Sequence, residues 1–86
     1  MNTTITNHFE GKLSSKAYLF SIKHLNLDTD QEISLGTIIV NSQSAQFSIR
    51  LIYKKDNYIS KDFDLNVLAK DCLDYARQLE DICIIF

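Results

Sequence analysis

The side chains best suited to chemistry gather between residues 50 and 61, where basic residues alternate with aromatic ones. Lysine and arginine neutralise phosphate groups and tyrosine rings stack on bases, so the pattern is typical of nucleic-acid or nucleotide binding. It is equally typical of a solvated hairpin tip, whose lysines discourage association between sheet edges. Tyr53 belongs by alternation to a core face, which argues against binding. The candidate residues of this basic hairpin are Arg50, Lys54, Lys55, Tyr58 and Lys61.

A second candidate surface is acidic and lies in the C-terminal stretch, residues 62–86. Residues 62–81 contain six acidic residues against only two basic ones, Lys70 and Arg77. Carboxylates on a helix can steer a basic protein partner toward it, but they are also what an ordinary helix presents to water. We assign Asp71, Asp74 and Asp81 to a candidate acidic helix face for partner binding.

The sequence offers little for catalysis or metal binding. His8 and His24 are the only histidines, and Cys72 and Cys83 lie eleven residues apart without a CxxC motif. Catalysis needs several groups that converge in one cleft, and no nucleophile motif is present. The Asx-rich stretch 26–32 lacks the central glycine of a calcium-binding EF-hand loop. We therefore expect no enzyme activity, no cofactor and no metal site.

Length and composition describe a single small domain, residues 1–86. The formal net charge is −2, which is too small to argue for general nucleic-acid binding. The N-terminal residues do not resemble a secretory leader, and no apolar run approaches the length of about 20 residues that spans a bilayer. Both cysteines are typical of buried core residues in a reducing compartment. We expect a cytoplasmic protein that does not enter a membrane.

The strongest structural signal lies in residues 62–86, where apolar residues recur with alternating steps of three and four. This spacing predicts one apolar face of a long α-helix. Asp64 is the expected N-cap, and Phe63 before it is expected to pack on Leu68. The predicted face consists of Leu65, Leu68, Cys72, Tyr75, Leu79, Ile82 and Phe86.

The last five residues, 82–86, are uncharged and apolar. A helix continuing through them would be longer than a small sheet is wide, so its last turns would overhang. The run of isoleucines favours a strand instead, but nothing after Leu79 would break the helix. We expect the helix to continue, with residues Ile82, Ile85 and Phe86 available for self-association. The expected result is a homodimer, with a monomer as the alternative.

Before the helix, alternating apolar residues predict strands over 16–25, 33–40 and 45–54, with a short strand near 58–61. Residues 1–7 are expected to fray or to supply an edge strand, and Glu10-Gly11-Lys12 is expected to be a turn. Gly36 marks a bulge or a close approach by another group. These elements predict an α+β two-layer sandwich, in which one long C-terminal helix packs on the apolar face of an antiparallel sheet of about four strands.

We infer from this combination a small non-enzymatic binding module that inhibits or modulates a macromolecular partner through protein–protein contacts. The preference for Ile, Asn and Lys indicates an AT-rich coding source. Compact acidic proteins with this bias include phage and mobile-element inhibitors of host defence, among them anti-CRISPR proteins. The alternatives are a nucleic-acid or nucleotide binder that uses the basic hairpin, and a small subunit of an obligate assembly.

The nucleic-acid alternative predicts a specific loss of binding. If the basic hairpin contacts phosphates, affinity for an oligonucleotide will fall steeply with salt and will be lost in a Lys54→Glu, Lys55→Glu double variant. Filter binding or fluorescence anisotropy across a salt series measures both effects. Binding that responds to neither change removes this alternative.

Overall fold

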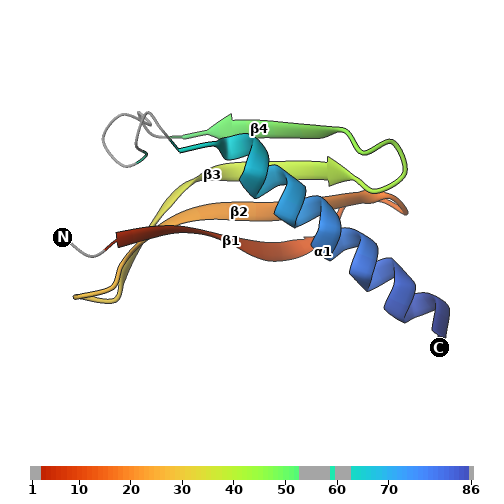
Figure 1. Cartoon of the computed structure of the whole chain (residues 1–86), viewed down its shortest axis with the longest axis horizontal. Helices are drawn as coiled ribbons and strands as arrows, with labels where there is room; N and C mark the ends of the chain where they lie inside the picture. Colours follow the sequence, from red (N-terminus) through yellow and green to blue (C-terminus); the bar gives the residue numbers. More distant parts are fainter. Residues whose placement is uncertain (1–2, 53–58, 60–62, 86) are drawn as a thin grey trace.

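The computed structural model describes residues 3–52, 59 and 63–85, with side chains described through Asp81. Four strands precede one helix: β1 (Thr3–Lys12), β2 (Ala17–Asn26), β3 (Gln31–Asn41), β4 (Phe47–Leu51) and α1 (Leu65–Ile85). The strands form an antiparallel sheet in the order β1-β2-β3-β4, and α1 lies across one face of it (Figure 1). The predicted α+β two-layer sandwich is confirmed. The strand predicted near 58–61 lies outside the described residues.

Alternation along the central strands decides which face of the sheet is apolar. Tyr18, Phe20 and Ile22 of β2 are buried, and they lie opposite Val40, Ile38 and Gly36 of β3. Opposite residues of an antiparallel pair share a face, so these side chains form one continuous apolar layer under the helix. Ile49 and Leu51 extend this layer from β4.

The strands are joined by tight turns, and two of these have the same geometry. Asn26 and Asn41 each accept hydrogen bonds at the side-chain oxygen from the backbone two and three residues later. Each turn closes on a residue with φ of 60°, Asp30 in one and Ala45 in the other. In both turns the asparagine side chain accepts hydrogen bonds that a backbone carbonyl would otherwise accept, and this stabilises the turn.

The expected turn at Glu10-Gly11-Lys12 is wrong. β1 runs through these residues to Lys12, and the connection to β2 is made by residues 13–16 instead. The glycine serves a different purpose, because the register with β2 shifts between Phe9 and Gly11. Gly11 has a φ of 154°, a conformation that glycine adopts readily and other residues rarely do. The residue interpreted as a turn is thus a bulge in a long strand.

Gly36 occupies the second bulge, as the sequence predicted. The register between β2 and β3 shifts between Ile22 and Lys23, and Leu35 beside the glycine is buried. A Cβ at position 36 would lie 2.0 Å from the carbonyl oxygen of Arg50. Only glycine allows β4 to approach β3 this closely.

The helix contacts the sheet along a face that differs slightly from the predicted one. Ala69 and Ala76 are fully buried, whereas Tyr75, assigned to the buried face, is 45% exposed. Small side chains let the helix approach the sheet closely, which places the larger Tyr75 at the border. Its ring still packs on Phe9 and Phe20, with centroids 5.8 and 5.9 Å apart. The buried helix residues are Leu68, Ala69, Cys72, Leu73 and Ala76.

The helix continues to Ile85. This confirms the expectation that the chain stays helical after Leu79 rather than forming a strand. It crosses the sheet diagonally, and its last turns project beyond β1 and beyond the end of the sheet (Figure 1). Leu79 is the last described residue that packs against the core. The predicted overhang is therefore present.

Substitution of Gly36 should be among the most destabilising single changes in the sheet. Gly36→Ala would drive a methyl group into the backbone of β4, and we expect a loss of about 3 kcal/mol in the free energy of unfolding. Urea denaturation followed by circular dichroism measures this loss.

Gly11→Ala is the matched control. A methyl group at position 11 would meet no atom within 4 Å, so only backbone strain opposes the change, at about 1 kcal/mol. Equal losses at the two positions would contradict the close approach at Gly36.

Candidate functional site

A groove beside the first half of α1 combines apolar and acidic side chains. It has a volume of about 400 Å³ and lies between the helix and β1, which contributes Ile5. Its helix residues are spaced by three and four positions, so they share one face. We call this site the acidic groove; its lining is Ile5, Phe63, Asp64, Val67, Leu68 and Asp71.

The apolar lining of the acidic groove is only partly buried. Leu68 is 7% exposed and belongs to the core, whereas Val67 is 55% and Phe63 36% exposed. An exposed valine and phenylalanine beside a concave surface lose contact with water when a partner covers them. The groove therefore offers a partner hydrophobic contact area.

Two carboxylates give the groove its charge. Asp64 caps the helix as the sequence predicted, its Oδ1 accepting a hydrogen bond of 2.9 Å from the Asn66 backbone N–H. Asp71 lies further along the same helix face, is exposed, and forms no hydrogen bond or ion pair with another described residue. No basic side chain is among the described residues that line the groove. A cationic group on a partner would be attracted to these two carboxylates.

The three residues assigned to the acidic helix face are all exposed on α1. Their spacings of three and seven residues place them on one side of the helix. Among the described residues that line the groove, Asp71 is the member of this set, and it lies there with Asp64. Partner binding by the acidic helix face stays a prediction.

Most of the predicted basic hairpin lies outside the described residues, namely Lys54, Lys55, Tyr58 and Lys61. Arg50 is in β4 opposite Thr37 and is exposed. Its neighbours Ile49 and Leu51 pack against the core, so by alternation Arg50 points away from the helix. Nucleic-acid binding by this hairpin stays a prediction.

The predicted self-association residues are placed only in part. Ile82 and Ile85 lie in the last turns of α1, beyond the described core, and Phe86 lies outside the described residues. Their participation in a homodimer stays a prediction.

The sheet face opposite the helix carries polar side chains that contact one another, together with the apolar pair Leu19 and Ile39. Ser21 donates a hydrogen bond of 2.8 Å to Glu10, and Glu32 lies 3.8 Å from Lys23 and 3.7 Å from His8. These contacts partly neutralise its charges. This face is a weaker candidate than the acidic groove.

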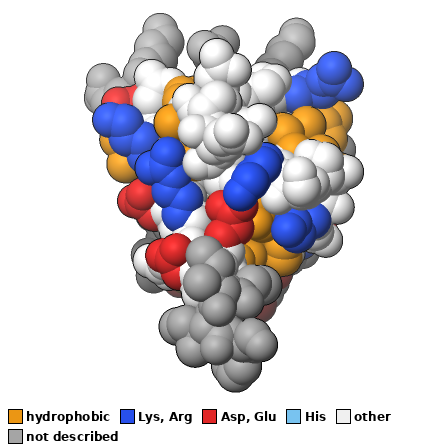
Figure 2. Space-filling model, turned by 90° about the vertical axis from the view of Figure 1, so that its right-hand side faces the viewer, with side chains coloured by type: hydrophobic (Ala, Val, Ile, Leu, Met, Phe, Trp, Pro, Cys, Tyr) orange, Lys and Arg blue, Asp and Glu red, His pale blue; other side chains and the backbone are white. Residues whose placement is uncertain are grey.

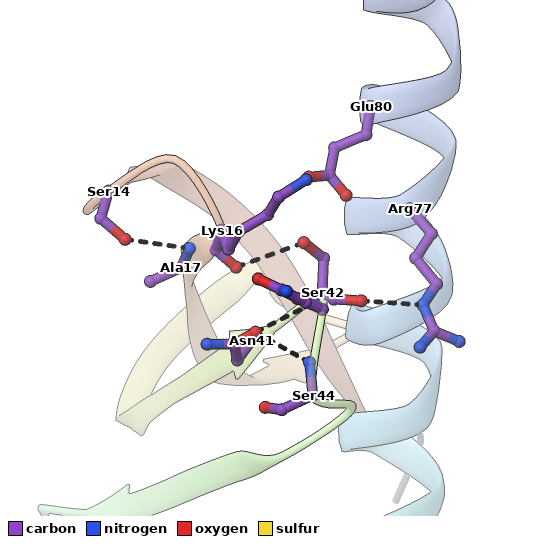
Figure 3. Close-up of polar contacts among 9 residues, drawn as sticks. Ser14, Lys16, Ala17, Asn41, Ser42, Ser44, Arg77 and Glu80 are labelled. Carbon is purple, nitrogen blue, oxygen red and sulfur yellow. Dashed lines mark hydrogen bonds and ion pairs between the residues drawn. The ribbon is translucent and has the colours of Figure 1, made fainter.

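A polar cluster fastens the second half of α1 to the hairpin ends (Figure 3). The Lys16 ammonium lies 3.0 Å from the Glu80 carboxylate, and Arg77 Nε donates to the Ser42 carbonyl oxygen at 3.3 Å. Ser42 is buried and its backbone N–H donates to the Lys16 carbonyl at 2.9 Å. Because these groups satisfy one another, the cluster positions the second half of the helix.

The same contacts change the acidity of Glu80. A hydrogen bond from Lys16 and a weaker effect of a hydrogen bond from Ser42 hold the pKa of the Glu80 carboxyl below the ordinary value of 4.5. The positive charges of Lys16 and Lys12 lower it by smaller amounts. Basic and acidic side chains are interspersed on this end of the molecule rather than separated by sign (Figure 2). The end is therefore held together by charge pairing and presents no field of one sign.

The remaining candidate groups show no reactive arrangement in the described part of the chain. Burial raises the pKa of the Cys72 thiol to about 11, with a further contribution from the charge of Asp71, so this thiol stays protonated at neutral pH. No three His, Cys, Asp or Glu residues are grouped in that part to hold a metal ion. Nor does that part contain a helix long and apolar enough to cross a membrane.

Comparisons with protein-family models, with curated proteins and with solved structures found no match for this chain. The site must therefore be interpreted from its own chemistry.

Sequence reasoning missed most of the acidic groove. Asp71 was identified, but Ile5 comes from the other end of the chain, and only the fold brings it to the helix. Val67 and Asp71 lie on the same helix face as Asp64, at steps of three and four residues, and this pattern was available in the sequence. The presence of a valine, Val67, at one of these positions was the signal from which the groove could have been predicted.

The Lys16–Glu80 pair predicts a defined pH dependence of stability. Since the folded pKa of Glu80 is lowered, its contribution is present above the ordinary value of 4.5 and is lost as pH falls through the lowered pKa. Glu80→Gln should therefore be less stable than the parent near neutral pH, and the difference should shrink in acid. Thermal denaturation across a pH series measures it.

Lys16→Met provides the control. In that background Glu80→Gln should change stability little at any pH, because the partner is already gone. A pH-dependent difference that persists without Lys16 would contradict the pairing.

Proposed function

We propose that this protein is a small non-enzymatic module that binds a protein partner through the acidic groove. The observation that carries the proposal is the combination of exposed apolar side chains, Val67 and Phe63, with the exposed carboxylate of Asp71 in one concave surface. Burial of the apolar groups supplies affinity, and the charge selects the partner and its orientation.

The chemistry of the groove specifies what the partner would present. A volume of about 400 Å³ accommodates one or a few side chains rather than a whole domain. The best match is an apolar side chain of the partner flanked by lysine or arginine, which would pair with Asp71 and Asp64. A basic surface segment of a protein has this composition.

The consequence of binding would be inhibition or modulation, because covering a functional segment blocks its other contacts. Within this proposal we place the protein among phage or mobile-element inhibitors of host defence, of the anti-CRISPR kind, acting in the cytoplasm. The AT-rich residue usage and the small acidic domain support this class. The buried and protonated thiol of Cys72 suits a reducing compartment.

Charge reversal within the groove tests the proposal. Asp71→Lys would repel a basic partner segment, and we expect at least about a tenfold loss of affinity. Val67→Glu should have a similar effect, because it removes the exposed apolar contact. Immobilised protein incubated with bacterial lysate, followed by titration of the captured partner in purified form, measures both.

Asp74→Lys is the matched control, since it makes the same charge change on the same helix outside the groove. The Asp74→Lys variant should bind the partner with the affinity of the parent. Capture of general chaperones alone, or capture that is equal for all variants, would count against the groove as the binding surface.

A further inference from the structure

β1 forms one edge of the sheet and is ten residues long. Within the described part of the chain it pairs only with β2, so the backbone groups on its other side have no strand partner there. Proteins usually protect such an edge with charged residues, proline or a very short strand. Residues 3–9, T-T-I-T-N-H-F, contain no Lys, Arg, Asp, Glu or Pro. The protective charges and the bulge of β1 are confined to its last residues, Glu10 to Lys12, and residues 3–9 lack the features that prevent edge pairing.

The opposite edge of the described sheet, β4, differs in length and charge. β4 has five residues and carries the exposed charge of Arg50. The bulge in β1 is confined to its end, between Phe9 and Gly11, which leaves the preceding residues in regular pairing geometry. Of the two edges, β1 is the one able to accept another strand.

We propose that β1 pairs with β1 of a second copy of this chain, antiparallel and related by a two-fold axis at Asn7. Opposite residues share a face, so the axis must pass through a residue position. An axis at Asn7 places Ile5 opposite Phe9 of the second copy. Aromatic and β-branched residues are a favourable cross-strand pair, and this one occurs twice by symmetry.

Neighbouring registers are less favourable. An axis at His8 places that histidine against itself, and an axis at Thr6 places the exposed ring of Phe9 against Thr3. With the axis at Asn7, Thr6 lies opposite His8 of the second copy, the same pair of side chains that contact within one chain at 3.2 Å. No like charges are opposed between residues 3 and 9.

The helix supports the same arrangement. Phe9 is 38% exposed and its ring lies against Tyr75, so an apolar surface borders the unpaired edge. The last turns of α1 project beyond β1 (Figure 1). A two-fold axis perpendicular to the sheet keeps both helices on one face of a continuous sheet formed by the described strands of the two copies.

The dimer would also complete the acidic groove. Ile5 lines the groove, and Phe9 of the second copy would lie next to it and extend its apolar wall. The dimer does not depend on the proposed function, because it is measured on the purified protein without any other partner. Failure of either proposal leaves the other standing.

Light scattering across a concentration series is the first test. We expect a mass of about 19.8 kDa, twice 9.9 kDa, at high concentration. Asn7→Asp places two like charges at the axis and should weaken the dimer by about fivefold or more. Gln31→Glu adds the same charge at the start of β3, away from the β1 edge, and should leave the dimer unchanged. A monomer at all concentrations overturns the proposal.

Disulfide trapping tests the register. In a Cys83→Ser background, Asn7→Cys would place two thiols directly opposite each other, within disulfide reach, and should give a covalent dimer under mild oxidation. The buried, protonated Cys72 does not compete. Thr4→Cys is the control, since its two copies would lie roughly 20 Å apart along the strands. Equal trapping at both positions overturns the register.

A chain ending at Asp81 separates the strand from the overhang. The described core ends at Leu79, so this chain should stay folded by circular dichroism. With β1 as the principal contact, the truncated chain should still form a trapped dimer through Asn7→Cys. A dimer that is unaffected by Asn7→Asp and becomes monomeric on truncation would place the interface in the helix end alone and overturn the pairing of β1.

Discussion

The close approach of α1 to the sheet is the constraint on which the rest of the molecule depends. Ala69, Cys72 and Ala76 have almost no exposed surface, so the helix backbone lies as near the strands as side chains allow. A helix held this closely adopts one crossing direction, which here is diagonal (Figure 1). The diagonal leaves the acidic groove beside its first half and carries its second half beyond β1. The groove and the overhanging helix end are thus results of one packing contact.

The polar contacts between the helix and the hairpin ends support this packing. Lys16, Ser42, Arg77 and Glu80 hold the far half of the helix against two hairpin ends, at the place where few apolar contacts remain. An ion pair in this partly exposed position contributes modestly to stability, and its main effect is on orientation. The apolar core sets the distance between the two layers, and the polar cluster sets the direction of the helix end.

Local patterns in the sequence predicted most of the fold and little of the site. Alternation and helical spacing identified the sheet, the helix, its cap at Asp64 and the special position of Gly36, because each depends on neighbours in the chain. Glu10–Lys12 was misassigned, since glycine is common both in turns and in bulges. The prediction that Tyr75 points into the core was also wrong, because the alanines of the helix face, Ala69 and Ala76, set how closely the helix packs on the sheet. The acidic groove needs Ile5 beside the helix, and that contact is decided by the crossing direction alone.

The strand order β1-β2-β3-β4 has a consequence for synthesis on the ribosome. Each strand pairs with the one made just before it, so the sheet can assemble progressively as the chain emerges. The helix is made last, and until it docks, the apolar layer of Tyr18, Phe20, Ile22, Ile38 and Val40 has no cover. Until the helix docks, the exposed layer is a site for chaperone binding or for aggregation.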